Sequence, residues 1–234
     1  DGIYLDCTVG FGGHSSEILK TISNNGFLIG LDLDPYALKK AKEKLSKIKN
    51  RKFALHHSSY KEFPAILSKC GITKVDGFLF DLGISSYQVN SEHRGFSYMS
   101  NSPLDMRFNP TGDNQTAYCF LKNVGEDELS KAFKIYGDIS HSKKIAKGII
   151  QRRNCNKMKT TSDLKKAVKD SIGIANNKMF SRIFQTIRIC VNKELEVFKE
   201  TLQIIPNFLN KSGRICIISF HSIEDRITKH FFNY

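Results

Sequence analysis

The first hundred residues alternate short apolar runs with amphipathic segments, and this alternation constrains the fold more than any other feature of the chain. The β-like runs are Ile3–Val9, Phe27–Leu33, Phe53–His57 and Gly77–Leu82. Strands that alternate with helices form a parallel sheet through right-handed crossovers. The sequence therefore predicts an α/β protein with a Rossmann-like parallel sheet.

Two of the intervening segments carry helix-start signals. Asp34 and Pro35 place a capping residue before a proline at the first helical position, which favours a helix from there to about Ile48. Ser15 and Ser16 are hydroxyl residues at the start of the preceding segment, and we expect them to cap its helix.

From about residue 109 to 181 the alternation stops and only helical patterns remain. This stretch holds 14 Lys and Arg against 7 Asp and Glu, which is over half of the chain's net charge of +13. One long helix should follow, with a fifth strand at Arg214–Phe220. We therefore predict a cofactor-binding domain at 1–108 and 182–234, with a basic, all-helical substrate-recognition subdomain at 109–181 inserted between strands 4 and 5. The stripe of the long helix is Ile187, Val191, Leu195, Phe198 and Leu202.

Charge and cysteine usage bear on partners and compartment. A surplus of 36 Lys and Arg over 23 Asp and Glu favours a polyanionic partner, although a generally lysine-rich organism would give the same balance. The six cysteines are scattered without metal-ligand or redox spacing, so we expect no metal and reduced, buried thiols in a reducing compartment. No apolar run reaches spanning length and no signal peptide opens the chain, which favours the cytoplasm, with a mitochondrion or plastid as the alternative.

A glycine-rich loop follows the first β-like run, with Gly10, Gly12 and Gly13 before His14. Glycines let a backbone turn sharply and approach a ligand closely. The carboxyl end of a strand that leads into a helix is where doubly wound sheets bind cofactors. Alone, this spacing fits either a cofactor loop or an ordinary tight turn.

Asp32 lies at the end of the second β-like run, and Asp34 directly follows it. A carboxylate at this position can accept both hydroxyls of a ribose, so Asp32 is the candidate ribose ligand and Asp34 the candidate helix cap. Together with the glycine loop, Asp32 predicts an adenosyl cofactor. These features fit a methyl-donor cofactor and a nicotinamide cofactor equally.

Five sequence blocks then carry a specific resemblance across nearly the whole chain. In chain order they are GFGGHS from Gly10, DLGISS from Asp81, RGFS from Arg94, PLDMR from Pro103 and SFHSIEDR from Ser219. In this combination the chain resembles the bacterial 16S ribosomal RNA cytosine-N4 methyltransferase family RsmH, also called MraW, which has mitochondrial relatives. The resemblance implies a class I methyltransferase fold, S-adenosyl-L-methionine as cofactor and a cytidine of small-subunit ribosomal RNA as substrate. The apolar runs predict no membrane partner, and the sequence leaves the oligomeric state open.

The resemblance also implies which residues bind the cofactor. They are Gly12, Gly13, His14, Asp32, Tyr60, Asp81 and Gln88. Tyr60 stands where the family usually has Phe, and either ring could lie against the adenine. Val9, His93 and the pair Asn101-Ser102 also depart from the family pattern, and the chain ends at Tyr234 before a C-terminal segment that completes the family's sheet. We therefore expect a fragment with an unpaired sheet edge.

Methylation of a cytosine amine needs a hydrogen-bond acceptor that will take the departing proton. Many amino methyltransferases carry an N/D-P-P-Y loop after the fourth strand for this purpose. Here that place reads Asp81-Leu82-Gly83-Ile84, so the loop is lacking. Asp105 is the candidate acceptor and Arg107 the candidate ligand of a phosphate or base edge; the two can equally form a structural pair.

Further candidates concern the target nucleotide. His221 can bind the extruded nucleotide, move a proton, or hydrogen-bond the backbone. Phe96, Tyr87 or Tyr98 can stack on the base or belong to the core.

Rival functions remain open at this stage. They are another amino methyltransferase, a nicotinamide dehydrogenase, and an inactive or truncated homologue that acts as an RNA-binding or ribosome-assembly factor.

Overall fold

The computed structural model describes residues 1–233 and divides into two compact units. The sheet unit comprises Asp1–Gly83 and the segment from Leu195 onward, and the helical unit comprises Ile84–Glu194. Each has its own apolar core.

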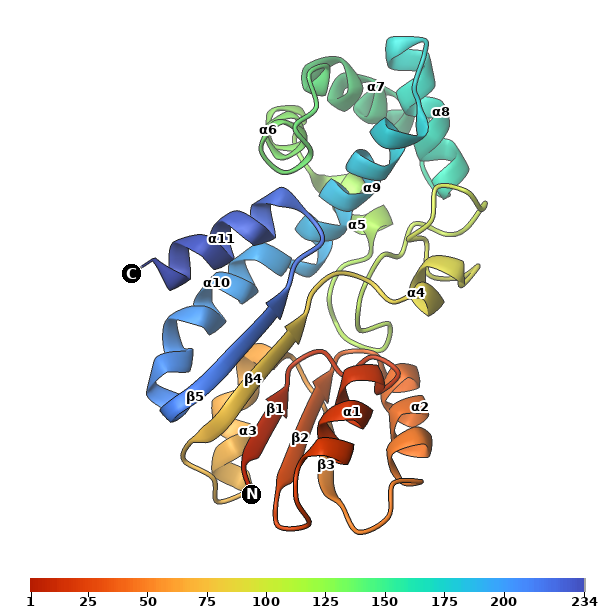
Figure 1. Cartoon of the computed structure of the whole chain (residues 1–234). Coiled ribbons are helices and arrows are strands. Elements are labelled where there is room, and N and C mark those ends of the chain that lie inside the picture. Colours follow the sequence, from red (N-terminus) through yellow and green to blue (C-terminus); the bar gives the residue numbers. More distant parts are fainter. Residues whose placement is uncertain (234) are drawn as a thin grey trace. The chain divides into compact units, whose positions relative to one another are not determined.

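The sheet unit is built on five parallel strands in the order β3-β2-β1-β4-β5 (Figure 1). This order matches the first five strands of a doubly wound Rossmann-type sheet, and the fold is that of a class I methyltransferase. The direction of winding reverses between β1 and β4, where such sheets bind their ligands. The strands are β1 (Ile3–Asp6), β2 (Phe27–Asp32), β3 (Lys52–His57), β4 (Val75–Asp81) and β5 (Leu209–Ile218).

Helices cover both faces of this sheet (Figure 1). Successive residues of β2 point to opposite faces: Leu28 packs with α1 and α2, while Ile29 packs with α3 and α10. The helical elements of the sheet unit are α1 (Gly13–Thr21), α2 (Pro35–Leu45), η1 (Tyr60–Glu62), α3 (Phe63–Lys69), α10 (Glu194–Ile204), η2 (Ile205–Phe208) and α11 (Ser222–Phe232).

The two helix starts predicted from sequence have different outcomes. Asp34 caps α2 as predicted, because its carboxylate accepts a hydrogen bond from the Tyr36 N–H and Pro35 occupies the first turn. The prediction that Ser15 and Ser16 cap α1 is wrong. The cap is Gly12 in a left-handed conformation, and both serines are buried inside the helix.

The helical unit packs around one core that involves most of its helices. Phe133, Ile145, Leu164 and Ile187 are fully buried in it and come from four different helices. The helices are α4 (Ser86–Asn90), α5 (Ala117–Asn123), α6 (Glu126–Gly137), α7 (Ser142–Asn154), α8 (Thr161–Ile172) and α9 (Asn177–Asn192).

This unit is wider than the insertion at 109–181 that the sequence predicts. Phe96, Leu104 and Met106 are buried in the helical core, as are Phe184 and Val191 of α9. The flanking segments therefore belong to the helical unit by packing, and the predicted stretch lies wholly inside it. That residues 109–181 recognise substrate stays a prediction.

The single long helix predicted around Ile187–Leu202 is two helices, α9 and α10. Lys193 ends α9 with a φ of +51°, which a continuous helix cannot contain. Arg188 and Glu194 form a buried, bidentate ion pair at this break, at 2.8 and 2.9 Å. The apolar spacing from Val191 to Leu195 continues across the break and conceals it.

The cysteines are less buried than the sequence predicts. All six cysteines are free, but the prediction that they are buried holds for Cys7 alone: Cys70, Cys119 and Cys190 are half-buried, and Cys155 and Cys216 are exposed. Cys216 lies on β5, which ends the strand order and, within residues 1–233, pairs only with β4. None of the helices in residues 1–233 has the length and apolarity needed to span a bilayer.

Candidate active site

The loop between β1 and α1 is held by buried polar contacts at the point where the sheet reverses its winding. Asp6 is 1% exposed, and its carboxylate accepts hydrogen bonds from Ser15 Oγ at 2.5 Å and the Thr8 N–H at 3.1 Å. Burial raises the pKa of Asp6 to about 6 against the lowering effect of these bonds. Thr8 Oγ1 in turn accepts the Asp81 N–H at 2.6 Å, which joins the loop to the end of β4.

Asp32, the predicted ribose ligand, is fixed in orientation by two backbone donors. Its Oδ2 accepts the Gly10 N–H at 2.7 Å and its Oδ1 accepts the Asp34 N–H at 2.8 Å. Burial raises the pKa of this carboxyl above its ordinary value, against the lowering effect of the backbone hydrogen bonds. Each oxygen keeps one lone pair for a further donor, so the carboxylate can accept a pair of hydroxyls.

The glycine loop passes close to the sheet because Gly30 of β2 carries no side chain. A Cβ on Gly30 of β2 would lie 2.5 Å from Val9 and 2.6 Å from Leu55, so Val9 occupies the space that a side chain would fill. Gly12 has a φ of +74° and precedes Gly13 at the start of α1. A Cβ on Gly13 would meet nothing within 4 Å.

Asp81 and His14 face each other at the carboxyl end of β4. Asp81 Oδ2 lies 3.5 Å from His14 Nε2, and both side chains are partly exposed. Within the part of the chain that the structure describes, Asp81 Oδ1 is buried and accepts no hydrogen bond. Buried acceptors are rarely left unpaired, so this oxygen marks a place where a ligand donor fits.

Tyr60 stands at the end of β3 in η1. Its ring packs edge-to-face on Phe80 of β4, with ring centroids 5.5 Å apart. Phe80 directly precedes Asp81, so the aromatic pair borders the residues described above. The contact of Tyr60 with adenine stays a prediction.

Gln88, the remaining predicted cofactor residue, belongs to the helical unit and is buried in α4. It forms a capping box with Ser85: the Ser85 N–H donates to Gln88 Oε1 at 3.0 Å, and the Gln88 N–H donates to Ser85 Oγ at 3.2 Å. These contacts account for a structural role. A cofactor contact for Gln88 stays a prediction.

Asp105 and Arg107 form a bidentate pair in the loop before α5. Nε and Nη2 of Arg107 donate to the two carboxylate oxygens, each at 2.9 Å, and the Arg107 N–H donates to Oδ1 at 3.0 Å. Arg107 Nη1 also donates to the Gly112 carbonyl at 3.0 Å. The pairing raises the pKa of Arg107. The structural pair considered from sequence is therefore present, and three of the four acceptor positions of Asp105 are used.

Two of the three aromatic candidates for base stacking pack in the core of the helical unit. Phe96 is 6% exposed and stacks on Phe108 at 6.0 Å. Tyr98 packs between Phe180 and Phe184. Both rings therefore serve the helical core, while Tyr87 is half-buried.

His221 is the N-cap of α11. Its Nδ1 accepts the Glu224 N–H at 3.4 Å, and its Nε2 lies 3.1 Å from Glu224 Oε1. His221 therefore hydrogen-bonds the backbone, which is one of the three roles that the sequence left open for it. A substrate role for His221 stays a prediction.

The departures from the family pattern fit their surroundings. Val9 is buried over Gly30, as described above. Ser102 is fully buried, where its N–H donates to Thr161 Oγ1 at 2.9 Å and its carbonyl accepts the Thr161 N–H. His93 is exposed.

Asp6, Thr8 and Ser15 are the site residues that the sequence prediction missed. Asp6 and Thr8 lie in the first β-like run, directly before the glycines of the loop, and both places were available as signals. Within residues 1–233, no three His, Cys, Asp or Glu side chains are placed to hold a metal ion.

A sequence profile of the MraW methylase family matches residues 1–234. The Ribosomal RNA small subunit methyltransferase H of Clostridium botulinum (strain 657 / Type Ba4) is 45% identical over 98% of this chain and 74% of that protein. The protein of the same name from Clostridioides difficile (strain 630) is 44% identical over 100% of this chain and 76% of its own. A solved rRNA methylase from Streptococcus thermophilus aligns over 36% of this chain and 46% of its own, at 18% identity and a TM-score of 0.31, which is too slight a likeness to support an argument.

Proposed function

The chain belongs to the MraW methylase family, and from that premise we propose that it transfers the methyl group of S-adenosyl-L-methionine to the N4 amino group of a cytidine in small-subunit, 16S-type ribosomal RNA. The ribosomal substrate is supported by the two relatives named above, both of which are called ribosomal RNA small subunit methyltransferases. The observation that carries the cofactor assignment is the buried, unpaired Oδ1 of Asp81 beside His14.

The residues at the carboxyl ends of β1, β2 and β4 fit an adenosyl group. Asp32 presents a carboxylate whose orientation is fixed by the Gly10 and Asp34 N–H groups, as a ribose ligand requires. Asp81 offers the unpaired acceptor described above, and Gly13 leaves open space at the start of α1. Tyr60 supplies an aromatic edge. When bound, S-adenosyl-L-methionine supplies an electrophilic methyl group on a sulfonium.

The amine loses a proton when it is methylated, and a residue of this chain can accept it. We assign that role to Asp105, because one acceptor position on its Oδ2 remains after the three hydrogen bonds from Arg107. The bidentate pair fixes the orientation of the carboxylate, which suits an acceptor that has to be positioned before the transfer. Arg107 contributes by holding Asp105, and a direct contact from Arg107 or His221 to the nucleotide belongs to the same proposal.

The test is incubation with radiolabelled S-adenosyl-L-methionine and small ribosomal subunits that lack the modification, followed by identification of the labelled nucleoside. We expect label in N4-methylcytidine, lost with Asp32→Ala and kept with the control Glu43→Ala, an exposed carboxylate on α2. Label in any other nucleoside would refute the cytidine assignment. Cofactor binding without transfer would instead favour an inactive, RNA-binding homologue.

The role of Asp105 has its own variant. Asp105→Asn keeps the size of the side chain and removes its charge, so we expect cofactor binding to persist while turnover is lost. Full turnover by Asp105→Asn would contradict the role of Asp105 while leaving the reaction itself intact.

A further inference from the structure

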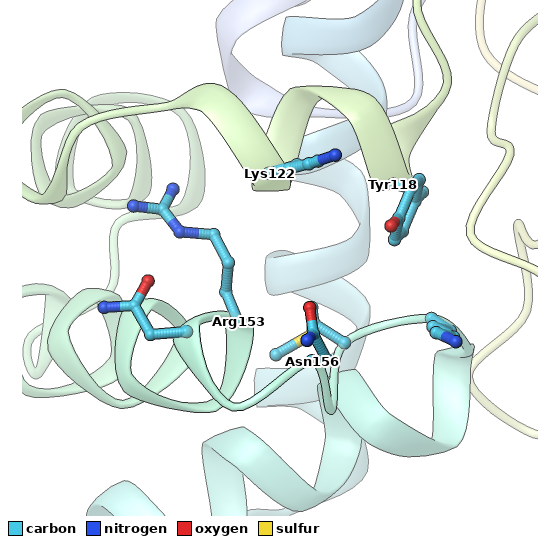
Figure 2. Close-up of a pocket in the computed structure, with 7 residues that line it drawn as sticks. Tyr118, Lys122, Arg153 and Asn156 are labelled. Atoms are coloured by element: carbon cyan, nitrogen blue, oxygen red, sulfur yellow. The ribbon is translucent and has the colours of Figure 1, made fainter.

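A pocket of about 280 Å³ lies in the helical unit, between α5 and the segment that joins α7 to α8. Figure 2 shows Tyr118 and Lys122 on α5 and, opposite them, Arg153 in the last turn of α7 and Asn156 in the segment that follows it. The complete lining is Tyr118, Lys122, Arg153, Asn154, Asn156, Met158 and Lys159. It combines cations, amides and one aromatic ring.

The charge in and around this pocket has one sign. None of its described lining residues is acidic, and within residues 1–233 neither Lys122 nor Lys159 is paired with a carboxylate. Residues 143–169 hold ten Lys and Arg but one acid, Asp163. That carboxylate is occupied in capping α8, where it accepts the Lys159 and Thr160 N–H groups at 2.9 and 3.0 Å. The pocket therefore favours an anion.

One of the cations is already ordered. Arg153 Nη1 donates to the Leu121 and Val124 carbonyls at 2.9 and 2.6 Å, at the C-terminal end of α5. These bonds fix the guanidinium in the wall of the pocket and leave its other donors for a ligand. A fixed guanidinium is well suited to phosphate oxygens, because its planar donors match their geometry.

Both walls of the pocket are joined to the loop that carries Asp105. The Tyr118 N–H donates to the Leu104 carbonyl at 2.7 Å, and the Leu104 N–H donates to the Lys159 carbonyl at 3.2 Å. Pro103 and Thr160 also form an isolated antiparallel bridge. The pocket and the Asp105 loop are therefore parts of one hydrogen-bonded assembly within the helical unit.

We propose that this pocket binds a phosphodiester of a single-stranded RNA segment, with the phosphate held by Lys122, Arg153 and Lys159 and the adjoining ribose or base against the ring of Tyr118. The volume is close to that of small-ligand sites, and an aromatic ring beside cations is how proteins hold unpaired strands without reading sequence. The site anchors the strand, while the chemistry belongs elsewhere. The inference rests on the proposed function only in taking RNA as the ligand.

The test measures binding of a short, fluorescein-labelled oligouridylate by fluorescence anisotropy, without S-adenosyl-L-methionine. Uridine has no N4 amine, so this probe cannot act as the methyl acceptor, and the result is independent of methyl transfer. The pocket variant is Lys122→Ala with Lys159→Ala. The matched control is Lys131→Ala with Lys134→Ala, which removes the same charge from exposed positions of α6. Thermal unfolding of each variant checks that it folds.

We expect the pocket variant to lose roughly tenfold in affinity at low salt and the control about twofold or less, with a shallower salt dependence for the pocket variant alone. Tyr118→Ala should weaken binding about fivefold or more, while Tyr118→Phe keeps it. Inorganic phosphate should displace the probe only at far higher concentration than unlabelled oligouridylate. Equal losses in the pocket and control variants, displacement by phosphate at the concentration of the competing oligomer, or no binding by the wild-type chain would each overturn the proposal.

Discussion

Removing the carboxylate of Asp81 should stabilise the chain without cofactor and weaken the binding of S-adenosyl-L-methionine. The two effects have opposite signs because Asp81 Oδ1 is buried without a donor in residues 1–233, whereas the proposed cofactor site uses it as an acceptor. The perturbation is Asp81→Ala. It leaves the hydrogen bond from the Asp81 N–H to Thr8 Oγ1 in place, because that donor is backbone.

The magnitudes follow from the surroundings of the carboxylate. An unsatisfied buried acceptor costs about 1 to 3 kcal/mol. The side chain is 32% exposed and its other oxygen lies 3.5 Å from His14 Nε2, so we expect a gain near the low end, about 1 kcal/mol in the free energy of unfolding. A hydrogen bond to a charged acceptor contributes about 1.5 to 3 kcal/mol, so the dissociation constant of the cofactor should rise about 10- to 150-fold.

Urea unfolding without ligand and isothermal titration calorimetry with S-adenosyl-L-methionine measure the two effects separately. Glu43→Ala on the exposed side of α2 is the control and should leave cofactor binding unchanged. A variant that is less stable without cofactor would show that the buried oxygen is satisfied in the folded chain. An unchanged dissociation constant would show that the cofactor does not use Asp81.

Two further predictions concern stability. Because the pKa of Asp6 is raised from 3.8 to about 6, folding favours its protonated form: its stabilising contribution is full below about pH 4 and is lost as the pH rises through 6, by at most about 3 kcal/mol. Urea unfolding across this window should show that slope in the wild-type chain and a flatter one in Asp6→Asn; identical profiles would argue against it. Gly95→Ala should destabilise the helical unit by more than about 2 kcal/mol in thermal or chemical unfolding, because φ is +71° and the new Cβ would lie 2.3 Å from the Pro103 carbonyl oxygen. Gly125→Ala, whose Cβ meets nothing within 4 Å, should cost under about 1 kcal/mol, and equal costs for the two variants would contradict the steric reasoning.

The sheet was largely predictable from the sequence because its signals are local. Each of the first four strands lies within a few residues of its predicted range, and Asp34 with Pro35 marks the start of α2. The sequence also located Asp32 and Asp81 at strand ends, where the structure supplies their hydrogen-bond environment. Hydrophobic periodicity and capping residues suffice for such features.

Features that depend on tertiary contacts were not predictable in this way. The break at Lys193 interrupts an apolar stripe whose spacing does not change, so periodicity alone gives one helix. Ser15 has the composition of a helix cap, but its hydroxyl is drawn into the helix by the buried carboxylate of Asp6 nine residues earlier. Phe96 lies in a motif segment and still belongs to the core, because residues 84–108 pack on helices that come later in the chain.

The contact between Val9 and Gly30 has a consequence for how this sequence can vary. The space above Gly30 is filled from both sides, by Val9 after β1 and by Leu55 of β3. A larger residue at position 30 therefore requires a smaller one at position 9 or 55, and a bulkier residue at position 9 needs room that position 55 has to release. These three positions share one volume, so substitutions among them should be inherited in compensating sets. The path of the cofactor loop therefore depends on residues of the second and third strands as well as on the loop's own glycines.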